Sequence, residues 1–433
     1  MDLRTGRLLG SARQLGKVPL FSASFLQTAG VSSAALKTPS MCRGERMSEP
    51  WVDWIPGVLA NHQIRELEKQ GFLVELQDPD QAIDASAVDL HIGSQAYETV
   101  EGSIKPFGDQ YLHQIQQQKL VKQIDPDESG AFKLKRGKTY LFEIIERLEK
   151  RTELAKARIF GQATPKSSVG RMDVLVRLVL DHMDSYDGFI PGDSLVKSSG
   201  HLFLEVTPIT FSVKVKPGVA LSQLRFIYGS PENCEFTGEQ VARTALGGGN
   251  VNSSLTVDLE PVRLGKDETP AVAFRALQEK QDGESFFELW EKKGLVADKP
   301  DPKEYWQIVP PQNNGRLTIK KDAFYILRSK EKIRLPKGLA VYCRAVDETI
   351  GEMRIHYAGF VHPGFGRFRK DGKDGTPLIF EVRGHDLDVS LKDGQTMAHI
   401  QFYRMSEDPH LNSDNMSYET QTLQLSKYFQ QWT

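Results

Sequence analysis

Short apolar runs separated by polar turns dominate the chain from residue 137 onward. Several runs are rich in β-branched residues or alternate apolar with polar positions, which is typical of strands. The pattern predicts strands at residues 139–144, 174–180, 201–206, 210–215 and 221–228. Because many short strands at such close spacing favour an all-β barrel or sandwich over a parallel sheet, we expect a mainly β fold.

Two elements are expected before these strands. Asn61 can cap a short helix that Gly71 ends. Residues 83–93 alternate like a strand that leads into a turn. Asp89 within this strand is interpreted as a carboxylate that fixes the turn rather than as a catalytic group.

A helical insert is expected later in the chain, over about residues 268–306. Thr269 can cap its first helix, and Pro270 occupies the first-turn position, where proline is favoured. The apolar residues of 286–290 predict a second short helix.

A repeat relates the two halves of the chain. One constant offset separates three pairs of residues: Glu205 from Glu381, Gly218 from Gly394, and Phe226 from Phe402. Because this offset holds across a strand, a turn and another strand, we interpret the chain as two copies of one β domain. The sequence LTVDL at 255–259 also echoes AVDL at 87–90.

The repeat divides the chain into four parts. They are a leader at 1–46, a first β domain at 47–235, a linker at 236–250 with glycines at 247–249, and a second β domain at 251–433 that holds the insert and a C-terminal tail.

Composition excludes several classes of protein. The 433 residues are 39% hydrophobic, and 55 Lys and Arg balance 57 Asp and Glu, so nothing in the charge indicates nucleic-acid binding. The chain has no run of 18 apolar residues, so the sequence predicts no membrane-spanning helix. The three cysteines are too few for a disulfide framework or a structural zinc site.

The leader differs from the rest of the chain. Its first 46 residues contain five Arg, two Lys and six Ser, against only Asp2 and Glu45. Such a composition resembles an organelle transit peptide, for a mitochondrion or a plastid, and Met47 could begin the mature protein. The alternatives are an over-long gene model or a tail outside the fold of a cytoplasmic protein.

A polar turn at 166–171 (KSSVGR) leads straight into the apolar run at 174–180. Lys166, Ser167, Ser168 and Arg171, with the backbone N–H groups around Gly170, can form charge-assisted hydrogen bonds to phosphate oxygens. An ordinary turn is the alternative.

The two copies differ at this turn. Aligning residues 168–171 with 349–352 places Glu348 and Glu352 opposite Ser167 and Arg171, and carboxylates there would repel a phosphate. The second copy instead has the hairpin sequence HYAGFVHPG at 356–364, which the first copy lacks. Each copy therefore holds part of a site.

These motifs together resemble the dCTP deaminase family, of the trimeric dUTPase-like β-barrel superfamily, and above all its double-length bacterial form. The Lys166 turn resembles the family's Arg-Ser-Ser-x-x-Arg phosphate turn, with Lys in place of the first Arg. The hairpin matches at Tyr357-Ala358 and Pro363-Gly364, and the tail matches at Tyr418 and Gln421. His362 stands where the family has Asp.

The resemblance implies two tandem dUTPase-like β-barrel or jelly-roll domains and the hydrolytic deamination of dCTP to dUTP and ammonia, in pyrimidine deoxynucleotide supply. The chain has no His/Cys-x-Glu with Pro-Cys-x-x-Cys, the signature of zinc deaminases. A carboxylate general base must therefore activate the water, and Glu205 and Glu381 each match the family's catalytic strand. Glu205 is favoured because its copy keeps the Ser and Arg partners, whereas Glu381 would serve if the site forms between copies.

The resemblance also implies roles for the other residues. Arg171 and Ser167 would orient the base and the water, while Lys166 and Ser168 would meet the triphosphate. The hairpin residues His356, Tyr357 and Ala358 would wall the ring, and Tyr418, Gln421 and Lys427 would close over the phosphates. Mg²⁺ is expected with the triphosphate, bound mainly by the substrate's own oxygens.

Two other functions stay open. One is a dUTPase-like pyrophosphatase, alone or combined with deamination, which the absence of a hairpin Asp at His362 disfavours. The other is a non-catalytic nucleotide-binding regulator. A homo-oligomer, such as a trimer, is expected, with no nucleic-acid or membrane partner.

Overall fold

The computed structural model describes residues 49–433 of this chain as one compact unit. Outside the description lie residues 1–48, 237, 247–252, 279–284, 291–298, 346–352, 357–358, 370, 372–374 and 412–420. The leader and the copy-two segment 348–352 therefore stay untested.

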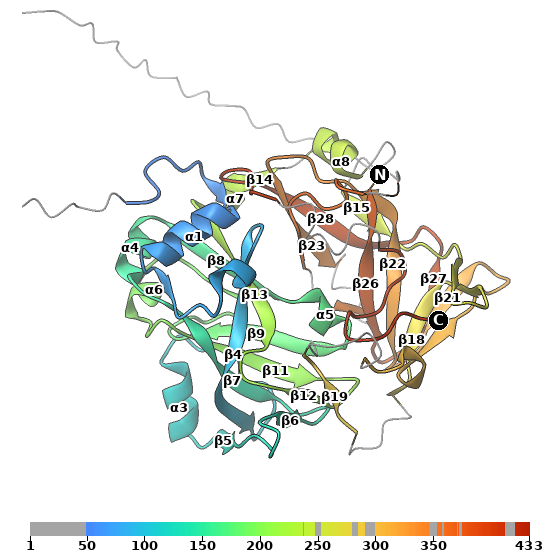
Figure 1. Ribbon diagram of the computed structural model, residues 1–433, viewed down its shortest axis with the longest axis horizontal. Helices are drawn as coiled ribbons and strands as arrows, with labels where there is room; N and C mark the ends of the chain where they lie inside the picture. The colour runs from blue at the N-terminus through green and yellow to red at the C-terminus, as the bar shows by residue number, and fades with distance from the viewer. Residues whose placement is uncertain are drawn as a thin grey trace, which may run out of the picture. The chain divides into compact units, whose positions relative to one another are not determined.

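The first barrel is built on one large antiparallel sheet in the order β10-β8-β13-β4-β7-β11-β9 (Figure 1). Off this path, the short strands β1 and β2 pair with β13 and β7, and β3 and β5 both pair with β4. The bounds of its strands are β1 Gly57–Val58, β2 Leu73–Val74, β3 Ile83–Asp84, β4 Ala87–Thr99, β5 Val121–Ile124, β6 Phe132–Leu134, β7 Tyr140–Leu148, β8 Ile159–Pro165, β9 Val174–Leu180, β10 Gly188–Phe189, β11 His201–Pro208, β12 Val213–Val215 and β13 Ala220–Tyr228.

Among the described residues, the second barrel contains two five-stranded sheets, the hairpin β16–β17 and the two-stranded sheet β21–β27. Its strands are β14 Glu235–Phe236, β15 Ser254–Thr256, β16 Val262–Leu264, β17 Thr269–Ala271, β18 Ala273–Ala276, β19 Phe287–Glu288, β20 Trp306–Val309, β21 Arg316–Ile319, β22 Phe324–Ile333, β23 Leu339–Ala345, β24 Met353–His356, β25 Phe360–Val361, β26 Thr376–Gly384, β27 Val389–Lys392 and β28 Thr396–Arg404.

Short helices cover the ends of the barrels. They are α1 Asn61–Lys69, α2 Pro79–Ala82, α3 Tyr111–Gln117, α4 Arg151–Lys156, α5 Ser167–Gly170, α6 Asp193–Lys197, α7 Pro231–Cys234, α8 Glu239–Leu246 and the 3₁₀ turn η3 Pro302–Glu304. Among the described helices, none is long and apolar enough to span a membrane. The mainly β prediction is confirmed. A helix lies where it was expected, but its N-cap is Ala60 rather than Asn61, and Gln63 Oε1 accepts a hydrogen bond from the Ala60 N–H.

Strand pairing reproduces the repeat. In the first barrel β13 pairs with β8, β4 and β1, and in the second β28 pairs with β23, β15 and β14. β11 lies between β7 and β9 as β26 lies between β22 and β24. Gly218 and Gly394 both turn in the left-handed region, at φ 82° and 75°, just before β13 and β28. The structure thus contains two copies of one β domain.

The pairing also corrects the LTVDL echo. Leu90 pairs with Ser222, and Leu255 pairs with Ala398, which is the repeat partner of Ser222. Leu255 therefore occupies the place of Leu90, four residues away from the alignment that the similar letters indicated.

The prediction of a helical insert is wrong for the residues that the structure describes between 268 and 306. Thr269–Ala271 forms strand β17 on β16, where an edge position tolerates Pro270. Phe287–Glu288 forms β19, which extends β12 of the first barrel in parallel and buries the Phe287 ring. Strand pairing overrides the local helix signals, and among the residues described in this range only η3 and Gln278 are 3₁₀-helical.

The segment predicted to be a linker begins with elements that correspond to the start of the first barrel. β14 pairs with β28 as β1 pairs with β13, and each is followed by a helix, α8 or α1. Ala242, Ala245 and Leu246 of α8 lie in the second core. The second copy therefore starts at about β14, before the glycines at 247–249.

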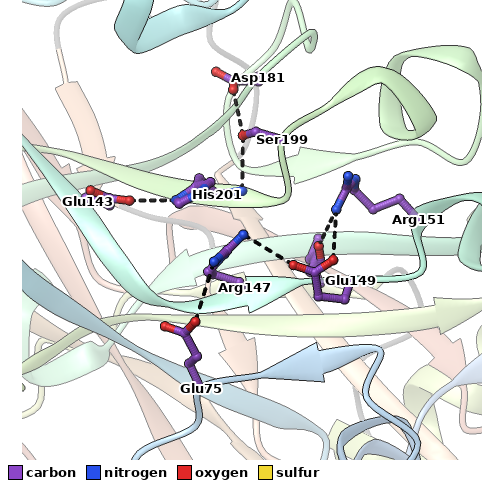
Figure 2. A network of polar contacts seen from close by, with 9 residues as sticks. Glu75, Glu143, Arg147, Glu149, Arg151, Asp181, Ser199 and His201 are labelled. Carbon is purple, nitrogen blue, oxygen red and sulfur yellow. Dashed lines mark hydrogen bonds and ion pairs between the residues drawn. The ribbon is translucent and has the colours of Figure 1, made fainter.

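One face of the first barrel carries an exposed polar network (Figure 2). Arg147 on β7 lies between Glu75 and Glu149, and Arg151 reaches the same Glu149. His201 on β11 contacts Glu143 at 2.6 Å. These groups are partly exposed and lie outside the cavity described below, so we interpret the network as a solvated structural face.

The two barrels are joined by a buried ion pair. Asp173, fully buried before β9, contacts the Arg383 guanidinium on β26 through Oδ2 at 3.0 and 3.1 Å. Thr210 of the first barrel also accepts a hydrogen bond from Arg383 at 3.2 Å. The tail after residue 421 packs through Leu423, Leu425 and Phe429 into a hydrophobic cluster that contains residues of both barrels.

We predict that Arg383→Ala lowers the free energy of unfolding by about 3–5 kcal/mol, because it leaves Asp173 buried without its cation. Urea unfolding followed by tryptophan fluorescence measures the change. Arg243→Ala is the matched control, since Arg243 forms an exposed pair with Glu239 at 3.2 Å and should change nothing measurable. Equal midpoints for Arg383→Ala and wild type would contradict the prediction.

Candidate active site

The polar turn at 166–171 is held rigidly between two strands. β8 ends at Pro165, α5 makes a single turn, and β9 begins at Val174. Val169 is fully buried, and the Lys166 N–H donates to the carbonyl of Leu221. The sequence anchors the turn by its apolar residue and leaves Ser167 exposed.

Glu381 of the second barrel faces this turn. It lies on β26, and its carboxylate approaches Gly170 so closely that a Cβ on that residue would lie 2.3 Å from Oε2. Arg171 Nε lies 4.0 Å from Glu381 Oε1. The glycine therefore makes room for a carboxylate that comes from the other copy. Figure 1 shows the two elements that carry these residues, α5 and β26.

Burial sets the proton affinity of Glu381. Desolvation raises the pKa of its carboxyl to about 8, although the charge of Arg171 opposes the rise and that of Asp173 adds to it. A carboxyl with such a pKa exchanges protons near neutral pH, as a general base must.

The C-terminal tail closes one side of the site. Gln421 Oε1 accepts a hydrogen bond from Arg171 at 3.1 Å, and Gln421 Nε2 donates to the carbonyl of Pro377 at 2.9 Å. Ser426 Oγ donates to the carbonyl of Ser168 at 2.7 Å. The tail thus fixes Arg171 and the turn together.

A cavity of about 190 Å³ lies where these groups meet. The first barrel contributes Lys166, Ser167 and Arg171 to its wall, and the second contributes Glu381, Gln421 and residues 360–363. It is therefore built from both copies within one chain.

Two ion pairs border the cavity. Lys166 Nζ contacts Asp89, and His362 Nε2 lies 3.1 Å from Asp84 Oδ1. Burial alone would raise the pKa of Asp84, but the hydrogen bond and charge of His362 outweigh it and lower the pKa to about 2. Among the described residues no group of three His, Cys, Asp or Glu could hold a metal ion.

The comparisons with known proteins agree with this geometry. The family model of the 2'-deoxycytidine 5'-triphosphate deaminase N-terminal domain matches residues 55–230, and that of the C-terminal domain matches residues 253–429. The chain belongs to the dCTP deaminase family. It carries both domains in tandem, and the assignment indicates an enzyme, a hydrolytic deaminase.

A solved structure supports the same assignment. The crystal structure of 2'-deoxycytidine 5'-triphosphate deaminase from Agrobacterium tumefaciens matches with a TM-score of 0.69 and 28% identity, over 82% of this chain and 97% of that one. No curated protein sequence matches the chain.

Glu205 was expected to be the base, with Arg171 beside it. The structure places Glu205 in a different environment. Ser103 Oγ donates to it at 2.6 Å, the N–H of Ile104 donates at 3.0 Å, and Tyr186 contacts it at 3.2 Å. The cavity wall does not include it. The expected pairing of Glu205 with Arg171 is therefore corrected, because the barrels meet so that Arg171 faces Glu381.

The other expected site residues divide into three groups. Lys166, Ser167, Gly170, Arg171 and Gln421 meet at the site. Ser168 and Lys427 are near it but do not line the cavity; Ser168 is buried and Lys427 is exposed. Tyr357, Ala358 and Tyr418 lie outside the described residues, and for His356 only the backbone, paired with Glu381, is described.

Some residues of the cavity wall could not be predicted from a sequence motif. Asp84, Gln223 and Arg225 reach the cavity from β3 and β13. None belongs to a motif, because their position depends on how the second barrel packs against the first. Asp89 was expected to fix a turn, but it lies within β4 and pairs with Lys166.

We predict that Gly170→Ala lowers kcat for deamination of dCTP by about 100-fold, because a Cβ would displace the Glu381 carboxylate by roughly an ångström. Ammonia release measures the rate. Gly192→Ala serves as the control, since a Cβ there meets nothing within 4 Å. Wild-type turnover by a folded Gly170→Ala protein would contradict the close approach.

Proposed function

We propose that the chain hydrolyses the C4 amino group of dCTP, giving dUTP and ammonia, with Glu381 as the general base. The observation that carries the proposal is the meeting of Glu381 with Arg171 and Ser167 at one cavity. The family assignment and the Agrobacterium tumefaciens structure support dCTP as the substrate.

In this proposal the ionised Glu381 takes a proton from water as the water oxygen attacks C4 of the cytosine ring. The protonated carboxyl then gives this proton to the amino group, the C4–N bond breaks and ammonia leaves. The proton that remains on the added oxygen moves to N3, which gives the carbonyl of the uracil ring. A general base of this kind contributes about 10²- to 10⁴-fold. Arg171, held by Gln421, orients the carboxylate and keeps its pKa from rising further.

Lys166 and Ser167 are proposed to bind the triphosphate, with Ser168 supporting the turn from behind. The cavity carboxylates already have partners, since Asp84 contacts His362 and Glu381 faces Arg171. Mg²⁺ would therefore arrive with the triphosphate and be held by its oxygens and by water, where it neutralises phosphate charge.

A pyrophosphatase activity is the second candidate, because the structure adds a carboxylate that residues 356–364 lack. These residues do not form the expected hairpin, since β24 pairs with β26 and β25 pairs with β23 of another sheet. Asp84 lines the cavity and is paired with His362, the residue that stands in place of the family's Asp. An ionised carboxylate there could activate water near the α-phosphate. Pyrophosphate release from dCTP or dUTP distinguishes this activity from ammonia release, and binding of dCTP without turnover would indicate a regulator.

The proposed site needs no second chain, because both of its halves come from one chain. A homo-oligomer, such as a trimer, remains a separate prediction that light scattering coupled to gel filtration tests.

We predict that Glu381→Gln lowers kcat for dCTP by about 10²- to 10⁴-fold, because the amide cannot take a proton from water. Glu205→Gln is the matched control from the other copy, and we expect it to keep turnover within a few fold. Ammonia and dUTP are measured together. Loss of turnover in Glu205→Gln alone would assign the base to the first copy and overturn the proposal.

The pH dependence follows from the raised pKa of Glu381. The base must be ionised, so log(kcat/KM) should rise by about one per pH unit below pH 8 and level off above it. Initial rates between pH 6 and 9.5 test this dependence. A profile that is flat down to pH 6 would mean that a group of ordinary carboxyl pKa is the base.

A further inference from the structure

Arg225 is a buried cation on the cavity wall that no motif indicated. It lies on β13, on the face that packs against the second barrel, and only 1% of its surface is exposed. It donates hydrogen bonds to the carbonyl of Val341 at 3.1 Å and to Ser86 Oγ at 3.2 Å. Its guanidinium carbon lies 3.8 Å from the centre of the Phe360 ring. All three neighbours are neutral.

No carboxylate balances this charge in the part of the chain that the structure describes. The Nε–H of Arg225 has no acceptor there. A guanidinium has five N–H groups, and only two contacts to acceptors are formed. Burial lowers the pKa of Arg225 to about 9. A buried cation without a counter-charge is costly, which indicates that something else supplies the negative charge.

The other two cations of the cavity differ from Arg225 in this respect. Lys166 contacts Asp89, and Arg171 lies 4.0 Å from Glu381. Among the described residues of the cavity wall, Arg225 is therefore the cation that no carboxylate balances. In the second barrel the same position of the repeat is the neutral Gln401, which donates to Glu235 at 3.2 Å away from the cavity.

We propose that Arg225 is a further substrate-binding residue, whose charge is balanced by the phosphate groups of the nucleotide in this cavity. The identity of the nucleotide rests on the proposed function, whereas the binding of an anion at Arg225 does not. Arg225 attracts the phosphates, and Phe360 holds its guanidinium plane through a cation–π contact across the two barrels.

The test is calorimetric titration of the full chain with inorganic tripolyphosphate, which has the charge of the substrate but no base or sugar. Arg225→Gln should bind tripolyphosphate at least 10-fold more weakly than wild type. Arg225→Lys, which keeps the charge, should bind within about threefold. Gln401→Met is the matched control from the other barrel and should bind as wild type does.

Thermal unfolding without nucleotide distinguishes charge from packing. If Arg225 carries an unbalanced charge, Arg225→Gln should unfold no earlier than wild type and should gain less from tripolyphosphate. Unchanged affinity in Arg225→Gln would overturn the proposal, and so would equal weakness of the Lys and Gln variants. Should wild type bind tripolyphosphate through Arg225 yet release no ammonia from dCTP, the proposed function would fail while this inference stands.

Discussion

The structure depends on two charge pairs that lie side by side where the barrels meet. Arg171 faces Glu381, and Asp173, two residues later in the turn before β9, contacts Arg383. Glu381 and Arg383 lie two apart on β26 and point to the same side, so the Asp173–Arg383 pair holds Glu381 against the turn at 166–171. The order of the charges is reversed between the two pairs, so a slip of β26 by two residues would bring like charges together. This is one way in which a buried ion pair specifies a single arrangement.

Packing around these pairs makes the site a property of both barrels. The tail binds Arg171 through Gln421 and buries Leu423, Leu425 and Phe429 in a hydrophobic cluster that both barrels share. β19 of the second copy adds a strand to β12 of the first barrel. Neither barrel could form the cavity alone, since the turn at 166–171, Glu381 and the tail come from different parts of the chain.

Sequence reasoning found what depends on local or repeated patterns. The strands, the helix at Asn61, the polar turn at 166–171 and the shared offset of Glu205 and Glu381 all leave a signal in neighbouring residues. What depends on contacts between the barrels left none. The choice between Glu205 and Glu381 depends on which strand faces the turn, and Arg225 is an ordinary strand residue until the second barrel covers it. The expected helical insert was wrong for the same reason, because β19 exists through its pairing with β12.

The two glutamates show how one position of the repeat differs between the copies. Glu205 occupies the position of Glu381 in the repeat, but Ser103, Ile104 and Tyr186 of its own barrel satisfy its oxygens. A carboxylate held in this way is bound within its own barrel, and Glu205 does not line the cavity. Glu381 lacks such a set of neutral donors among the described residues, and it faces a cation and a cavity instead. Its raised pKa is the physical consequence of that difference, because burial without hydrogen-bond donors disfavours the charged form.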